Sequence, residues 1–359
     1  MNIPQQVAAL GQSLWLDNLS RSLIHDGTLA RHIAEHAVTG VTSNPSIFQN
    51  ALASSPYYAE DLARLKGAES NPERRYEALA IPDIQAACDL LDPVYEQSGG
   101  YDGYVSLEVA PRWANDAFKT VEEAQRLATA VKRRNLLVKV PGTPAGVQAF
   151  EALTALGINV NVTLLFSLAQ TQAIFDAYIR GLTARIRAGI DIRRSRAVAS
   201  LFLSRVDTLV DAQLDAIGTQ EALAMRGKAA VAMARLAYQA YRDTFHGPAF
   251  AALAQQGATP QTLLWASTGV KNPAYRDLLY VEPLIGPETI NTLPDKTLAA
   301  LIDHGRPAVH VNEGTDEARA QFDDLARLGI DMEHVGLRLQ KDGVDLFETA
   351  FGKLLQEAA

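Results

Sequence analysis

The segment LLVKVPGTPAGVQAFEAL, Leu136–Leu153, opens with a short apolar run, Leu136–Pro141, that is typical of a buried strand. Similar runs recur along the chain. They are separated by longer segments that are rich in alanine and charged residues and have helical spacing, such as Val121–Arg134, Leu168–Gly189 and Gln220–His246. Strands that alternate with helices predict parallel βαβ units.

Eight such runs indicate eight strands, and two architectures have this order of elements: a closed (β/α)8 barrel and an open doubly wound sheet. No G-x-G-x-x-G segment follows the first run and no G-x-x-x-x-G-K-[ST] segment occurs, which weakens the nucleotide-binding open sheet. Eight units in one chain favour the barrel, so the predicted fold class is α/β, a (β/α)8 TIM barrel. The predicted strands are Ser13–Leu19, Val38–Asn44, Gly103–Val109, Leu136–Pro141, Gly157–Leu165, Ala197–Leu203, Thr262–Ser267 and Leu279–Leu284.

The chain has 359 residues, more than eight βα units require, and the additional residues fall in three places. We expect an added helix in residues 1–12, a helical insertion at about 49–100 and terminal helices at about 313–358. No Gly/Ser linker, internal repeat or low-complexity tract interrupts the chain, so we expect residues 1–359 to form a single domain.

Composition argues against several classes of protein. Hydrophobic residues make up 48% of the chain and charged residues 21%, which is enough for a large core. The formal net charge of −8 argues against a general nucleic-acid-binding surface. No run of 18 apolar residues occurs, so we expect no segment that spans a membrane. A single cysteine, Cys88, excludes an internal disulfide and a cysteine-based zinc site. The start of the chain lacks the features of a signal peptide, so we expect a cytoplasmic protein.

Polar residues stand near the C-terminal ends of seven successive predicted strands. Side chains alternate between the two faces of a strand, and the active sites of (β/α)8 barrels lie at the C-terminal ends of the strands. One polar residue in such a place would mean little, but seven strands in succession predict a polar pocket for one ligand. These residues are Asp17, Asn44, Glu108, Lys139, Asn161 with Thr163, Ser200 and Ser267, and Phe202 shares a face with Ser200.

Lys139 lies inside an apolar strand, and two explanations fit that position. An edge lysine could extend its ammonium group into water. A partly buried lysine would instead have a lowered pKa, and its neutral amine could attack a carbonyl to form a Schiff base without any metal.

Schiff-base chemistry also needs proton carriers, and Asp17 and Glu108 are the carboxylates at strand ends. Each could instead cap a helix or pair with an arginine. Thr163 could hold a water between Glu108 and Lys139, although threonine is also simply a good strand former.

The late strands carry groups that suit a phosphate. Arg205 follows the sixth strand, and Ser267 and Lys271 flank Gly269 in the segment WASTGVKNP. Cations, a hydroxyl and backbone N–H groups near a glycine are typical of phosphate sites, and barrels often bind phosphate at their last strands. A solvated loop is the alternative.

Three segments resemble the transaldolase family, in its longer bacterial type. They are GVTSNPSIFQNA (Gly40–Ala51), LLVKVPGTPAGVQAFEAL (Leu136–Leu153) and GINVNVTLLFSLAQ (Gly157–Gln170). The second resembles the family's active-site signature, with Lys139 at the Schiff-base position. The matches keep the family's order from about residue 13 to 273.

The resemblance implies a mechanism that uses no metal and no cofactor. Lys139 would form an imine with the donor ketose phosphate. Glu108 would act as acid and base through a water held by Thr163, and Asp17 would take the proton of the donor's C4 hydroxyl. Arg205 would bind phosphate, and the residues that would complete the substrate site are Asn44, Asn161, Ser200, Ser267 and Lys271. The shorter transaldolases have an arginine just after the serine, where this chain has the segment STGVK.

The implied reaction moves a dihydroxyacetone unit from sedoheptulose 7-phosphate to glyceraldehyde 3-phosphate, in a monomer or a homodimer. A fructose 6-phosphate aldolase is the nearest alternative, but such proteins are shorter and typically carry glutamine at the position of Glu108 and tyrosine at that of Phe202. A non-catalytic sugar-phosphate-binding barrel is a second alternative. It would not need Lys139, Glu108 and Asp17 together.

Overall fold

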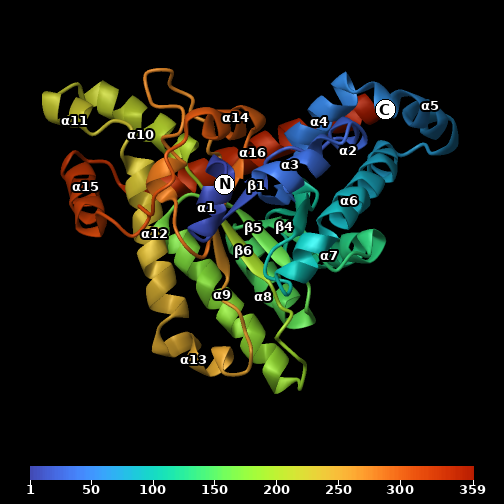
Figure 1. Cartoon of the computed structure of the whole chain (residues 1–359), viewed down its shortest axis with the longest axis horizontal. Helices are drawn as coiled ribbons and strands as arrows, with labels where there is room; N and C mark the ends of the chain where they lie inside the picture. The colour runs from blue at the N-terminus through green and yellow to red at the C-terminus, as the bar shows by residue number, and fades with distance from the viewer.

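Eight parallel strands close into a barrel in the computed structural model, which describes all 359 residues (Figure 1). The strands follow one another around the barrel in chain order, and the last pairs with the first. The predicted fold class is confirmed. The strands are β1 Gln12–Leu16, β2 Val38–Thr42, β3 Tyr104–Glu108, β4 Leu136–Pro141, β5 Val160–Leu165, β6 Ala197–Phe202, β7 Thr262–Ala266 and β8 Thr289–Leu293.

The strands are apolar because both of their faces are covered. Every residue of β4, β5 and β6 is buried, one face against the barrel interior and the other beneath the helices. Trp15 and Trp265 are among the largest side chains that are fully buried. A single cluster of 87 buried apolar residues joins the barrel to the helices around it.

The prediction of the eighth strand at Leu279–Leu284 is wrong. These residues form a turn and the 3-10 helix η3 (Glu282–Leu284), and β8 follows at Thr289–Leu293. Pro283 has no N–H group, so it could not complete the hydrogen bonds of a barrel strand that has a neighbour on both sides. The sequence TINTL of β8 is not an apolar run, but every polar side-chain atom in it except Asn291 Oδ1 has a hydrogen-bond partner. Asn291 Nδ2 donates to the carbonyl of Tyr280 at 3.1 Å.

Several of the helices that follow strands begin at a side chain that caps them. Asn44 Oδ1 accepts a hydrogen bond from the N–H of Ile47 at 3.0 Å, and Thr143 and Ser167 cap the helices after β4 and β5. These caps hold the turns at the C-terminal ends of the strands. The helices are α1 Ile3–Ala9, α2 Arg21–His25, α3 Thr28–His36, α4 Pro45–Ser54, α5 Ala59–Ala68, α6 Pro72–Gln97, α7 Ala117–Val131, α8 Pro144–Leu156, α9 Leu168–Arg187, α10 Ser204–Ile217, α11 Gln220–Ala224, α12 Ala229–Phe245, α13 Pro248–Ala254, α14 Asp295–His304, α15 Thr315–Arg327 and α16 Met332–Ala358.

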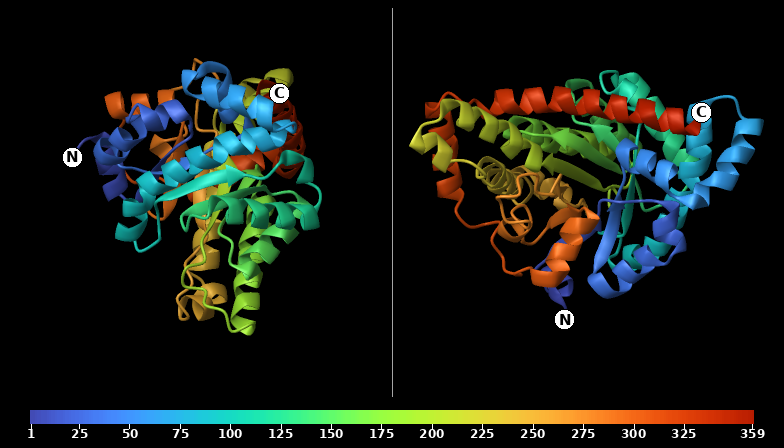
Figure 2. Two further views of the ribbon diagram at one scale, coloured as in Figure 1. Left: turned by 90° about the vertical axis from the view of Figure 1, so that its right-hand side faces the viewer. Right: turned by 90° about the horizontal axis from the view of Figure 1, so that it is seen from above.

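Helices outside the eight βα units pack onto the barrel. Three helices, α4, α5 and α6, separate β2 from β3 in the chain. Arg21 of α2 holds two of them: its Nε donates to Asp83 of α6 at 2.9 Å, and its Nη1 donates to Asp61 of α5 at 2.7 Å. The last helix, α16, is one long rod along one side of the molecule (Figure 2, right). It packs against α4 and α6. None of the helices is both long and apolar enough to cross a lipid bilayer.

Candidate active site

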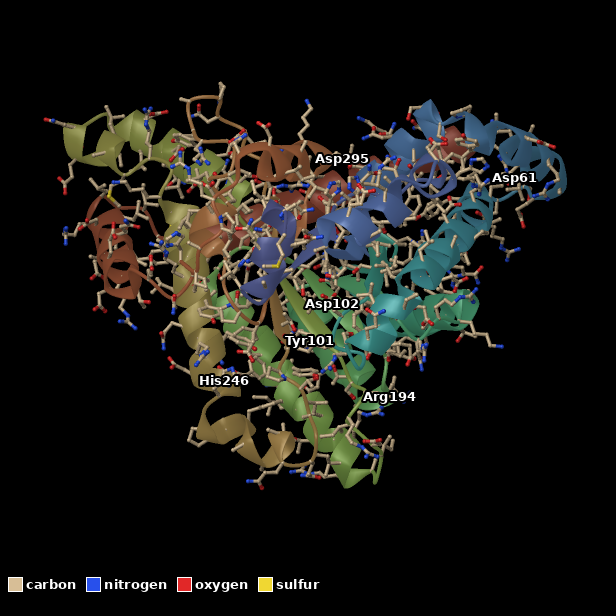
Figure 3. The ribbon with its side chains drawn as sticks, in the orientation of Figure 1. Asp61, Tyr101, Asp102, Arg194, His246 and Asp295 are labelled. Carbon is tan, nitrogen blue, oxygen red and sulfur yellow. The ribbon has the colours of Figure 1, made fainter.

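A polar cavity of about 210 Å³ opens at the C-terminal end of the barrel. Asp295 follows β8 at this end, whereas Asp102 precedes β3 at the opposite end, and both are labelled in Figure 3. Only four of the sixteen residues that line the cavity are hydrophobic, so it suits a polar ligand. Eight of the predicted site residues line it together: Asp17, Asn44, Lys139, Ser200, Phe202, Arg205, Ser267 and Lys271.

The amine of Lys139 is buried in the wall of this cavity. Its side chain is 6% exposed, so the amine does not extend into bulk water as the ammonium of an edge lysine would. Nζ donates a hydrogen bond to the carbonyl of Ser43 at 3.1 Å and lies 3.9 Å from Glu108 Oε2. This approach follows from strand register, because Glu108 and Lys139 are paired residues of β3 and β4.

Burial raises the pKa of Glu108 to about 7, against the opposing effect of the charge on Lys139. The carboxyl group therefore exchanges its proton near neutral pH, as a general acid and base must. Glu108 Oε2 and Thr163 Oγ1 are buried and have no hydrogen-bond partner within the protein, so both can bind a water. Thr163 lies on β5, the strand next to that of Lys139.

Replacing Glu108 with glutamine is expected to stabilise the fold at pH 8. The pKa of Glu108 lies near 7 in the folded protein against an ordinary 4.5, so stability is lost as the pH rises through this window. Urea unfolding should show a gain of up to about 3 kcal/mol at pH 8 and a much smaller gain at pH 5. Glu348→Gln, an exposed control, should change stability by less than about 0.5 kcal/mol at both pH values. An equal gain for Glu108→Gln at both pH values would contradict the raised pKa.

Asp17 is the second carboxylate of the cavity and lies one residue beyond β1. It caps no helix and pairs with no arginine: its Oδ1 accepts a hydrogen bond from Thr42 Oγ1 at 2.7 Å. Burial raises the pKa of Asp17, while the nearby charge of Lys139 lowers it. The two carboxylates therefore both interact electrostatically with Lys139, but Asp17 follows β1 whereas Glu108 ends β3.

A hydrogen-bonded polar layer stands beside Lys139. Asn161 is the register partner of Lys139 on β5. Its Nδ2 donates to Ser106 Oγ at 3.1 Å, and its Oδ1 accepts from Ser200 Oγ at 2.7 Å. Asn44 caps α4 through Oδ1, and its amide nitrogen makes no hydrogen bond within the protein. Hydroxyl and amide groups in these places can hydrogen-bond the hydroxyls of a sugar.

Two cations of the cavity have no carboxylate partner within the distance of an ion pair: Arg205, at the start of α10, and Lys271. The guanidinium of Arg205 lies 5.7 Å from the ring centre of Phe202. Ser267 adopts a left-handed backbone conformation, with φ at 55°, and its Oγ lies 2.8 Å from Ser204 Oγ. A cavity with two unpaired cations and hydroxyl groups is suited to a phosphate ester.

Eight of the sixteen lining residues are not among the predicted site residues: besides Thr42, Leu264, Ala266 and Gly269, they are Ser46, Thr292, Pro294 and Phe347. Ser46 stands in the first turn of α4, and Thr292 and Pro294 belong to β8 and the turn after it. The last two were missed because the eighth strand was placed ten residues too early. Phe347 comes from α16, and no local sequence pattern distinguishes it from an ordinary core residue.

Comparison with known proteins gives matches over nearly the whole chain. Residues 14–358 match the family model described as Transaldolase/Fructose-6-phosphate aldolase. The chain is 69% identical over 357 residues to the transaldolase of Thiobacillus denitrificans, with 99% of each chain covered. It is 51% identical over 355 residues to the transaldolase of Neisseria gonorrhoeae, again with 99% of each covered. Identity to the transaldolase of Mycolicibacterium smegmatis is 47% over 350 residues, which covers 97% of this chain and 94% of the relative.

Proposed function

We propose that Lys139 carries a three-carbon unit between two sugar phosphates, because this chain belongs to the transaldolase/fructose-6-phosphate aldolase family. The chain is an enzyme of the transaldolase type. The proposed donor is sedoheptulose 7-phosphate and the acceptor glyceraldehyde 3-phosphate, which give erythrose 4-phosphate and fructose 6-phosphate. One observation supports the assignment to Lys139 most strongly. Its amine is buried, lies 3.9 Å from Glu108 Oε2, and belongs to a residue that lines the same cavity as Asp17.

The first step is formation of the iminium ion. The neutral amine of Lys139 adds to the C2 carbonyl of the donor, its nitrogen then loses a proton, and the oxygen takes one up to give a carbinolamine. The carbinolamine loses its hydroxyl as water once a proton is supplied. Glu108 is placed to accept and return these protons through a water held with Thr163, and its pKa of about 7 lets it do both at neutral pH.

The second step breaks the carbon–carbon bond. Asp17 takes the proton of the C4 hydroxyl, the C3–C4 bond breaks, and its electron pair moves into the iminium ion to give an enamine on Lys139. The aldehyde product leaves. The enamine then attacks the carbonyl carbon of the acceptor, whose oxygen receives the proton that Asp17 held. Hydrolysis of the new iminium ion releases the ketose phosphate and restores the amine.

The substrate is held by groups that surround this chemistry. Asn44 and Asn161, with Ser200 beside them, are placed to bind the hydroxyls of the three-carbon unit. Arg205 binds the phosphate, and Ser267 and Lys271 complete that site. Their position at the cavity supports this assignment, since neither cation has a carboxylate partner.

The alternatives have less support. A fructose 6-phosphate aldolase would release free dihydroxyacetone, whereas the relatives compared above are named transaldolases and Phe202 presents a ring that cannot donate a proton. A barrel that only binds sugar phosphates would not need the buried pair of Lys139 and Glu108. We also infer a single domain and a cytoplasmic location for a monomer or homodimer. The cluster of 87 apolar residues that joins the barrel to its helices is consistent with a single domain, and the buried free thiol of Cys88 is consistent with a cytoplasmic location.

An assay with fructose 6-phosphate as donor tests transfer directly. With erythrose 4-phosphate present, we expect glyceraldehyde 3-phosphate to form at a rate at least about tenfold above the release of dihydroxyacetone without acceptor. The physical reason is that the enamine waits in a partly closed cavity for an aldehyde. Equal rates with and without acceptor would favour the aldolase, and no turnover of either kind would favour the binding protein.

A further inference from the structure

One face of α16 is built for close contact with the mouth of the barrel. Gly336, Gln340, Gly343 and Phe347 are spaced by four, three and four residues, so they lie on the same side of the helix. All four are buried. None of the signature segments of the sequence analysis includes them.

The two glycines let this face lie directly on the turn after β5. A Cβ atom at Gly336 would lie 2.6 Å from Ser167 Cβ, and one at Gly343 would lie 3.0 Å from Leu164 Cδ2. At Gly336 the contact is too close for a larger residue unless the helix moves away, whereas at Gly343 the neighbouring atom is the end of a leucine side chain, which can shift. The glycine at position 336 therefore sets the distance between α16 and the barrel.

The side chain of Gln340 fixes the helix to two active-site strands. Its Nε2 donates to the carbonyl of Gly142, just after β4, at 2.8 Å and to that of Leu164 on β5 at 3.1 Å. Leu164 has a left-handed backbone, with φ at 61°, which non-glycine residues seldom adopt. The amide of Gln340 thus joins α16 to the C-terminal ends of β4 and β5.

The same face places the ring of Phe347 over Lys139. The ring centre lies 6.0 Å from Lys139 Nζ, at the outer limit for a cation–π contact, so the main effect of the ring is to occupy space. Phe347 is 7% exposed and lines the cavity. Farther along α16, Arg75 Nη1 donates to the carbonyl of Ala358 at 2.7 Å, so the helix is held on both sides of Phe347.

We propose that Phe347 is a positioning residue of the active site, whose ring keeps water away from the enamine on Lys139. This inference rests on the proposed function. If water entered, the enamine carbon would take a proton from it, and a second water would add to the resulting iminium ion and release free dihydroxyacetone. The ring thereby favours transfer to the aldehyde over release.

The ratio of dihydroxyacetone release to transfer tests this role, because a merely structural defect lowers both rates together. Phe347→Ala should raise the ratio by about tenfold. Phe347→Leu fills most of the same space and should keep the ratio within about twofold of the wild type. Phe347→Val, a smaller change, should raise the ratio as well and covers the case in which the alanine variant does not fold.

Phe351→Ala provides a matched control one helical turn away. Phe351 packs edge-on against Tyr76, with ring centres 6.0 Å apart, and it does not line the cavity. Its removal should change stability and leave the ratio as it is. An unchanged ratio in Phe347→Ala, or in Phe347→Val where the alanine variant does not fold, would overturn the role of the ring. A rise in Phe351→Ala equal to that in the Phe347 variant would overturn it too.

Borohydride reduction with fructose 6-phosphate separates this inference from the proposed function. Failure of the wild type to form an adduct at Lys139 would refute the proposed Schiff base itself. Adducts at Lys139 in the wild type, Phe347→Ala and Phe347→Val, with the same ratio of release to transfer in all three, would refute only the role of Phe347.

Discussion

Replacing Lys139 with methionine is expected to lower kcat for transfer by about 10⁴-fold or more. Methionine fills similar space but has no amine, so no covalent intermediate can form in a cavity that otherwise keeps its shape. Borohydride treatment with fructose 6-phosphate should label the wild type at Lys139, as read by peptide mass spectrometry, and should leave the variant unlabelled. The coupled transfer assay gives the rate.

Lys66→Met is the matched control for this substitution. Lys66 is exposed on α5 and is not among the residues of the cavity, so its loss should change neither the rate nor the labelling. Undiminished transfer by Lys139→Met would reject the imine mechanism. Labelling of a different lysine in the wild type would place the Schiff base elsewhere.

Replacing Asp17 with asparagine is expected to lower kcat by about 10²- to 10⁴-fold while iminium formation continues. Asparagine can still accept the hydrogen bond from Thr42, but it cannot take the proton of the C4 hydroxyl. Carbon–carbon cleavage should therefore stop after the first step. Borohydride should trap the intact six-carbon sugar phosphate on Lys139 in the variant and mainly the three-carbon unit in the wild type.

The control for this prediction is Asp116→Asn. Asp116 is exposed and caps α7 by accepting a hydrogen bond from the N–H of Lys119 at 2.9 Å, which asparagine can also accept. Its rate and adduct mass should match the wild type. Trapping of only the three-carbon unit by Asp17→Asn would show that another group takes the C4 proton.

Local sequence predicts most of the barrel but not its closure. An apolar run between helical segments is typical of a parallel strand covered on both faces, which is why β4 and its neighbours could be recognised. The last strand shows no such run. Thr289 is tolerated in its buried sequence because its Oγ1 accepts a hydrogen bond from Gln12 Nε2 of β1 at 3.0 Å, and only the folded chain brings these two residues together.

The fold class and the chemical groups at the C-terminal ends of the strands follow from local sequence, since the type of a side chain and the period of a strand are local properties. Packing of distant segments is needed to bring Glu108 within 3.9 Å of Lys139, to raise the pKa of Glu108 to about 7 by burial, and to lay Phe347 over the amine. Distances and desolvation depend on how segments far apart in the chain pack together, and no local pattern contains that information.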